Sequence, residues 1–230
     1  MLNYPKPVAV LFDWDNTLAD TWPIIHQALH ATFTAMGKTP WTIEETKRNT
    51  HFSLRDAFPV LFGARWQEAR EIYFKTFLAV HLEKLAILPQ AEAVLRYLRA
   101  QGLFMGVVSN KTGKYLREEV TYLGWDKYFD VVIGATDAPE DKPSAAPLLL
   151  ALKESGIAPS QEVWLVGDAI TDLECALNAG CTPVYYGPYD VPESYIEAHP
   201  HRLEVLKTLR YTRDHDELLI FFRQLLSPES

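Results

Sequence analysis

Between residues 89 and 186, predicted helices alternate with short apolar runs, and this alternation restricts the fold more than any other feature of the sequence. The helices, each followed by a glycine, are predicted at about 90–101, 113–123, 144–155 and 170–179. The predicted strands are Phe104–Val108, Val131–Ile133, Val163–Val166 and Pro183–Tyr186. Glycine ends helices readily, and regular alternation of helix and strand is typical of parallel sheets. We therefore expect an α/β fold with a doubly wound, mainly parallel sheet.

The amino-terminal run Val8–Phe12 predicts a further strand of this sheet, although a long helical block separates it from the others. Five successive apolar residues fit a strand that is covered on both faces. From residue 18 to 88 we predict helices and no convincing strand. Thr42 with Glu45 forms a capping box for one short helix, and further helices are expected at about 53–62 and 65–83. The expected organisation is an α/β core domain of residues 1–17 and 89–230, and a small helical domain of residues 18–88 inserted after the first strand.

The carboxyl-terminal part has a less regular pattern. Prolines interrupt residues 187–210, and Leu203–Tyr211 fits either a short helix or a weak edge strand. Asp214 with Glu217 predicts a capping box for a final amphipathic helix.

Composition argues against several functional classes. The chain has 230 residues, 48% of them hydrophobic and 23% charged, and a net charge of −8, so there is no basic footprint for nucleic acid or an anionic membrane. No apolar run approaches the roughly 18 residues of a membrane span, and the amino terminus lacks a signal-peptide pattern. Cys175 and Cys181 are predicted to be small buried residues instead of a disulfide. We expect a cytoplasmic monomer or homodimer that binds neither nucleic acid nor membrane.

Polar residues follow four of the predicted strands, and parallel strands end at one edge of a sheet, where ligands bind. These residues are Asp13, Asp15 and Thr17; Ser109 and Asn110; Asp137, Glu140, Asp141 and Lys142; and Asp168 with Asp172. At least three carboxylates with one lysine and one hydroxyl suit a hard divalent cation, Mg²⁺ in particular when phosphate supplies a further ligand. Zinc is not expected, because no cysteine or histidine pair is placed there.

Four of these stretches resemble, in order, the motifs of the haloacid dehalogenase-like superfamily. They are Asp13-Trp14-Asp15-Asn16-Thr17, Ser109, Lys142-Pro143, and Gly167-Asp168 with Asp172. The resemblance covers roughly residues 8–186, and the helical insertion is similar to the small C1-type cap of phosphoglycolate phosphatase-like members. It implies an Mg²⁺-dependent phosphatase that hydrolyses a small phosphorylated metabolite through an aspartyl-phosphate intermediate.

The resemblance also implies a role for each motif residue. Asp13 would be the nucleophile and Asp15 the general acid and base. Mg²⁺ would be bound by Asp13, the backbone carbonyl of Asp15, and Asp168, with Asp172 as a further carboxylate. The phosphate-binding residues would be Ser109, Asn110 and Lys142.

Other positions are open to more than one interpretation. Asn16 stands where the family most often has glycine, and asparagine tolerates left-handed backbone better than most residues. Lys111 either reaches the phosphate or is a solvated surface lysine. In the insertion, Arg48, His51 and Arg55 are candidates to meet an anionic substrate tail and set specificity.

Other functions remain open beside hydrolysis. A phosphomutase of the β-phosphoglucomutase type uses the same four motifs, and a binding protein can keep the fold without turnover. Asp15 argues against carbon–halogen chemistry, because dehalogenases of the superfamily lack an acid/base aspartate there. Nothing marks Lys38 or Lys47 as the reactive cap lysine that phosphonoacetaldehyde hydrolases need. A phosphatase acting on a phosphoglycolate-like acid or a sugar phosphate is therefore the prediction.

Overall fold

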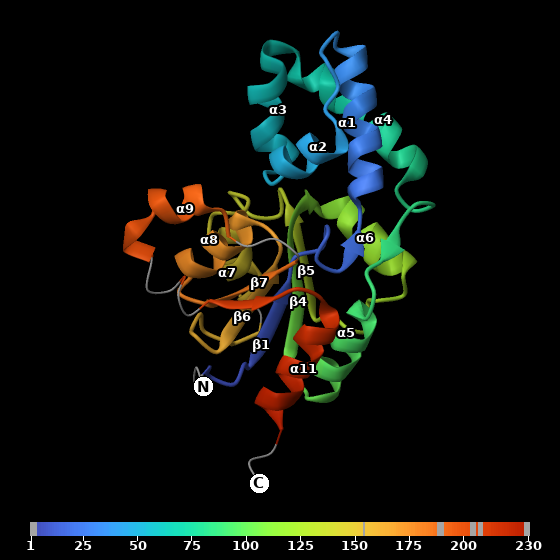
Figure 1. The fold of residues 1–230 in the computed structure, drawn as a ribbon. Coiled ribbons are helices and arrows are strands. Elements are labelled where there is room, and N and C mark those ends of the chain that lie inside the picture. Colours follow the sequence, from blue (N-terminus) through green and yellow to red (C-terminus); the bar gives the residue numbers. More distant parts are fainter. Residues whose placement is uncertain (1–3, 154, 188–190, 203–205, 207–208, 228–230) are drawn as a thin grey trace.

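In a computed structural model, six parallel strands form one sheet, which confirms the predicted α/β architecture (Figure 1). The structure describes residues 4–153, 155–187, 191–202, 206 and 209–227. The strand order is β5-β4-β1-β6-β7-β8. The strands are β1 (Ala9–Phe12), β4 (Phe104–Thr112), β5 (Val131–Ala135), β6 (Val163–Gly167), β7 (Thr182–Tyr186) and β8 (Arg210–Thr212). β1 lies between β4 and β6 and is fully buried, so the residues that follow it reach the middle of the sheet edge.

Helices cover both faces of the sheet. One apolar cluster joins the sheet to α5 (Ala91–Ala100), α6 (Gly113–Tyr122) and α11 (His215–Leu226). A second cluster joins the other face to α7 (Ala146–Leu152) and α8 (Ile170–Asn178), and it includes the free cysteines Cys175 and Cys181, buried as predicted. The alternation of side chains along β1 explains this division, since Val10 and Phe12 enter the first cluster and Ala9 and Leu11 the second.

The segment between β1 and α5 is mainly helical and has an apolar core of its own. Its helices are α1 (Trp22–Ala35), α2 (Ile43–Asn49), α3 (Leu54–Phe62), the 3₁₀ turn η1 (Gly63–Arg65) and α4 (Trp66–Val80). The predicted Thr42–Glu45 capping box is present at the start of α2. Ile24, Phe33 and Phe58 belong to a third buried cluster, and in Figure 1 α1–α4 lie together beyond one end of the sheet.

The expectation that residues 18–88 contain no strand is wrong at both ends of that segment. β2 (Ala19–Asp20) and β3 (Ala86–Ile87) form an antiparallel pair of two residues each. Strands this short cannot show an alternating pattern in the sequence. They pair because the chain leaves the sheet and returns to it side by side, and a further bond from the Leu88 amide to the Leu18 carbonyl closes the junction at 3.0 Å.

Near the carboxyl terminus, α9 (Glu193–Ala198) and the 3₁₀ turn η2 (Pro200–Arg202) precede the last strand. Within the predicted helix or edge strand Leu203–Tyr211, residues 203–205 and 207–208 lie outside the described residues, whereas Arg210–Thr212 forms the edge strand β8. Asp214 caps α11 by accepting a bond from the Glu217 amide at 2.9 Å, but the Glu217 carboxylate bonds to the Arg213 amide, so only half of the capping box forms. None of the described helices is both long and apolar enough to cross a membrane.

Candidate active site

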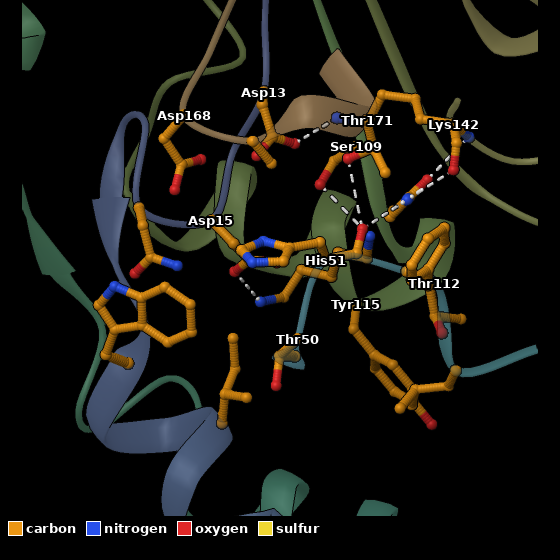
Figure 2. Close-up of a pocket in the computed structure, with 18 of the residues that line it drawn as sticks. Asp13, Asp15, Thr50, His51, Ser109, Thr112, Tyr115, Lys142, Asp168 and Thr171 are labelled. Atoms are coloured by element: carbon orange, nitrogen blue, oxygen red, sulfur yellow. Dashed lines mark hydrogen bonds and ion pairs between the residues drawn. The ribbon is translucent and has the colours of Figure 1, made fainter. Parts of the chain in front are cut away.

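The ends of β1, β4 and β6 meet the helical insertion at one pocket (Figure 2). Asp13 extends β1, and its amide is held by the Val166 carbonyl of the neighbouring strand at 2.8 Å. The pocket is lined from the sheet side by the predicted motif residues Asp13, Asp15, Ser109, Asn110, Lys142, Asp168 and Asp172. Residues of α1, α4, α6 and the loop before α3 close its other side.

Three carboxylates, two of them buried and that of Asp168 half-buried, form the most acidic part of this pocket. Asp13, Asp168 and Asp172 each offer an oxygen, and these atoms all lie within 4.8 Å of one another. Burial, together with Asp172 and Asp15, raises the pKa of Asp13 to about 6, although Lys142 opposes the shift. Burial and the same kind of repulsion from Asp13 and Asp172 raise the pKa of Asp168 well above its usual value. An all-oxygen donor set whose members repel one another fits Mg²⁺, which would relieve that repulsion.

Lys142 lies between two of these carboxylates. Its ammonium is 2.7 Å from Asp13 Oδ1 and 2.5 Å from Asp172 Oδ1, and it also donates to the Val108 carbonyl at 2.7 Å. Burial disfavours the ammonium, but the two carboxylates outweigh that effect and raise the pKa of Lys142. The side chain is therefore a fixed positive charge at the centre of the site.

Asn16, Gly167 and Thr17 shape the loops that carry the acidic residues. Asn16 has a φ of +62°, in the left-handed region that asparagine tolerates better than most residues, and its side chain accepts a bond from the Thr21 amide at 3.3 Å. A Cβ atom on Gly167 would overlap the carboxyl group of Asp172, so only glycine fits there. Thr17 donates to Asp168 Oδ1 at 3.1 Å and orients that carboxylate.

Asp15 belongs to a second buried charge network. Its Oδ1 is 2.7 Å from the Lys111 ammonium, which is also 3.2 Å from Oε2 of Glu119 on α6. Glu119 further accepts a bond from Trp14 Nε1 at 2.7 Å and lies 3.2 Å from His81 Nδ1. The Lys111 side chain is only 6% exposed, so the interpretation as a solvated surface lysine is wrong.

Sequence reasoning missed Glu119 because it stands next to Glu118, and nothing local distinguishes the two acids. A signal was nevertheless present, since Glu119 shares the face of Leu116 and Val120, the apolar side of that helix, and all three are buried. A carboxylate on an apolar face is rare unless it has a partner.

Ser109 and Asn110 follow the buried part of β4 but have different surroundings. Ser109 is buried at the pocket wall, and its hydroxyl accepts a bond from the Lys111 amide at 3.3 Å. The Asn110 amide group bonds to the backbone of Lys142 twice, at 2.9 Å each, and donates to the His51 carbonyl at 3.1 Å. Because its side chain is occupied in this way, any phosphate contact by Asn110 has to come from its backbone, and the side chain positions Lys142.

The three residues singled out in the insertion lie in different places. His51 lines the pocket, and burial lowers the pKa of its imidazole. Arg55 is turned to Asp141 instead, with two contacts at 2.7 and 3.0 Å, and is not among the lining residues. Arg48 is exposed and also does not line the pocket. Among the acids that follow β5, Asp137 pairs with Arg117 and does not line the pocket.

Comparison with known proteins gives one consistent result. Residues 10–185 match the family model described as haloacid dehalogenase-like hydrolase. The chain is 30% identical over 183 residues to a protein named phosphoglycolate phosphatase from Psychrobacter arcticus, covering 74% of this chain and 79% of that one. It is 31% identical over 172 residues to a protein named putative pyrophosphatase from Clostridium perfringens, covering 75% and 80%. A HAD-superfamily hydrolase of known structure from Ehrlichia chaffeensis superposes with a TM-score of 0.66 at 29% identity, covering 98% of this chain and all of the other.

Proposed function

This chain belongs to the haloacid dehalogenase-like hydrolases, and we propose that it is an Mg²⁺-dependent phosphatase that hydrolyses a small phosphorylated metabolite through an aspartyl-phosphate. One observation carries the proposal. A buried carboxylate, Asp13, lies beside a fixed ammonium, two further carboxylates and a second aspartate, all at the edge where the sheet meets the insertion. Relatives named as phosphatases support the same reaction.

Asp13 is the proposed nucleophile. Its carboxylate attacks phosphorus and forms an acyl phosphate while the bond to the leaving oxygen breaks. Lys142 keeps Asp13 oriented at 2.7 Å and adds positive charge where the phosphoryl oxygens would gather. Phosphoryl transfer depends mainly on such positioning and charge stabilisation. Ser109, buried at the same wall, would donate its hydroxyl to one phosphoryl oxygen.

Asp15 is the proposed acid and base. It would give a proton to the leaving alcohol oxygen and then take one from the water that hydrolyses the acyl phosphate. The contact with Lys111 at 2.7 Å holds its carboxylate in one orientation inside the pocket. Lys111 and Glu119 therefore position Asp15 and need not touch the substrate.

Mg²⁺ would be held by Asp13 and Asp168, with Asp172 beside them and the backbone carbonyl of Asp15 as a further proposed ligand. When bound, the ion supplies positive charge to the transferring phosphoryl group. Neighbouring residues hold these carboxylates in position. Thr17 orients Asp168, and Gly167 leaves room for Asp172.

We further propose that residues 18–88 act as a cap over a core domain of residues 1–17 and 89–230. The apolar core shared by α1, α3 and α4 supports this division. Two contacts tie the insertion to the core beside the site. Arg55 reaches Asp141, and the His51 carbonyl accepts bonds from Asn110 and Thr171.

The test is phosphate release from p-nitrophenyl phosphate with and without Mg²⁺. Wild type is expected to turn over only with the metal, and Asp13→Asn is expected to lose at least about a thousandfold in kcat, the order of an essential nucleophile. Equal activity of wild type and Asp13→Asn would refute the proposal, as would inertness of the wild type across a broad panel of phosphate esters. A sugar phosphate that is isomerised without net phosphate release would favour the mutase instead.

A further inference from the structure

We propose that the leaving group of this phosphatase is an uncharged alcohol with an aromatic or flat apolar face, and not a carboxylated alcohol such as glycolate. The inference rests on the proposed phosphatase function and concerns the half of the pocket opposite the carboxylates. Two features of that half carry it, the aromatic wall and the balance of charge.

The aromatic wall is formed by Tyr73, Phe74 and Phe77 of α4, Tyr115 of α6 and Trp22 of α1, all of which line the pocket. The ring centroids of Phe74 and Tyr115 are 5.0 Å apart, and those of Phe77 and Tyr115 are 5.7 Å apart, so the rings of α4 and α6 form one continuous surface. Tyr73 and Phe77 are buried, whereas Phe74 and Tyr115 are half-buried and keep part of their surface for a ligand. Aromatic faces bind flat apolar groups and other rings, not carboxylates.

The charge balance of the pocket disfavours a second anion. Among the described residues, its lining holds four aspartates and two lysines, a formal charge of −2. One divalent cation would bring this sum to zero, and the phosphate dianion then adds its own negative charge. A leaving group that carried a carboxylate would need a further cation.

Neither lysine of the lining is available for that purpose. Lys142 contacts Asp13 and Asp172, and Lys111 contacts Asp15 and Glu119, so each ammonium already lies between two carboxylates. Taking Lys111 from its partners would leave buried carboxylates without a counter-charge, which is costly. His51 also lines the pocket, and burial lowers the pKa of its imidazole.

The arginines that the sequence proposed as anion contacts do not replace these lysines. Arg55 is paired with Asp141, and Arg48 is exposed away from the lining. Charge and shape thus point to the same class of leaving group.

The experiment compares kcat/KM for benzyl phosphate, ethyl phosphate and 2-phosphoglycolate. All three release a primary alcohol, so ethyl against glycolate tests the carboxylate and ethyl against benzyl tests the ring. We expect benzyl phosphate to exceed ethyl phosphate by about tenfold, the scale of one well-packed aromatic contact, and 2-phosphoglycolate to be the poorest of the three. Higher kcat/KM for 2-phosphoglycolate than for ethyl phosphate would overturn the inference while leaving the phosphatase intact. Inertness toward all esters would instead refute the proposed function.

Variants of the wall test which residues select the ring. Phe74→Ala and Tyr115→Ala are expected to lower the benzyl-to-ethyl ratio of kcat/KM by about threefold to tenfold. Leu78→Ala on α4 and Tyr122→Ala on α6 are the matched controls, since both side chains are exposed and neither lines the pocket. The ratio is independent of the fraction of folded enzyme, so partial unfolding cannot imitate the effect. An unchanged ratio in both wall variants would overturn the assignment of the wall.

A gain-of-function variant tests the charge argument. Thr112 lines the pocket one turn before Tyr115, and its side chain makes no capping bond at the start of α6, so its loss disturbs little. Thr112→Lys would place an unpaired ammonium beside the wall. We expect the ratio of kcat/KM for 2-phosphoglycolate over ethyl phosphate to rise by about tenfold, the scale of one charge-assisted contact, and no rise would count against the inference.

Discussion

Removal of the Glu119 carboxylate should reveal how strongly the second charge network supports the protein. Glu119→Leu deletes an inaccessible carboxylate that faces the Lys111 ammonium at 3.2 Å, Trp14 Nε1 at 2.7 Å and His81 Nδ1 at 3.2 Å. Removing one partner of a buried ion pair costs roughly 3–5 kcal/mol. In Glu119→Leu, Lys111 still has Asp15 as a partner at 2.7 Å. We therefore expect the free energy of unfolding to fall by about 3 kcal/mol, the lower part of that range.

Urea unfolding at neutral pH measures this loss. Glu118→Leu is the matched control, since Glu118 is the adjacent residue, its side chain is 42% exposed and its nearest lysine is 4.0 Å away. The control should change the free energy of unfolding by no more than about 0.5 kcal/mol. If Glu119→Leu lowered the free energy of unfolding by no more than the control does, the assignment of a buried network would be refuted.

A double-mutant cycle separates the ion pair from simple burial. Lys111→Met and Glu119→Leu together should cost less than the sum of the single changes, by about 1–3 kcal/mol, because each single change leaves its partner uncompensated. Additive losses would mean that the two side chains do not depend on each other. In Glu119→Leu we also expect kcat to fall by about tenfold with little change in KM, since Lys111 would then pair with Asp15 alone.

Three further predictions concern other parts of the site and the core. Lys142→Met should cost roughly 3–5 kcal/mol at pH 7. The loss should shrink toward pH 5, because the pKa of Asp13 is raised to about 6 and this carboxylate takes up a proton there; an equal loss at both pH values in urea unfolding would contradict this. Gly167→Ala should displace Asp172 and weaken Mg²⁺ binding by about tenfold, measured by metal titration of activity, and unchanged affinity would argue against the overlap. Burial lowers the pKa of His215 from 6.5 to about 4, so folding excludes a proton that the unfolded chain binds, and the stabilising effect present above pH 6.5 is lost as the pH falls to 4. The loss should reach about 3 kcal/mol in urea unfolding, and His215→Phe should lack that part of the pH dependence, whereas the same slope in both proteins would refute the assignment.

Much of the fold was predictable because it depends on local patterns. The glycine-terminated helices and apolar strands between residues 89 and 186 reflect backbone preferences that act within a few residues. A parallel sheet then brings its strand ends together, so Asp13, Asp168 and Asp172 could be placed at one edge before their distances were known. The β2–β3 pair was not predictable, since two-residue strands carry no period.

The sequence by itself determined which residues make up the motifs and that a parallel sheet brings them to one edge. The tertiary structure decided how those residues are paired. Lys111 and Lys142 look alike in the sequence, yet one faces Asp15 and Glu119 and the other Asp13 and Asp172.

The same holds for the insertion. Its arginines suggested an anion contact, but the fold directs Arg55 to Asp141 and presents Phe74 and Tyr115 to the pocket instead. The physical reason is that burial and pairing depend on partners far apart in the chain, such as Lys142 and Asp13, which are separated by 129 residues. Local preferences place a side chain on an element, and only packing decides which charge or ring it meets.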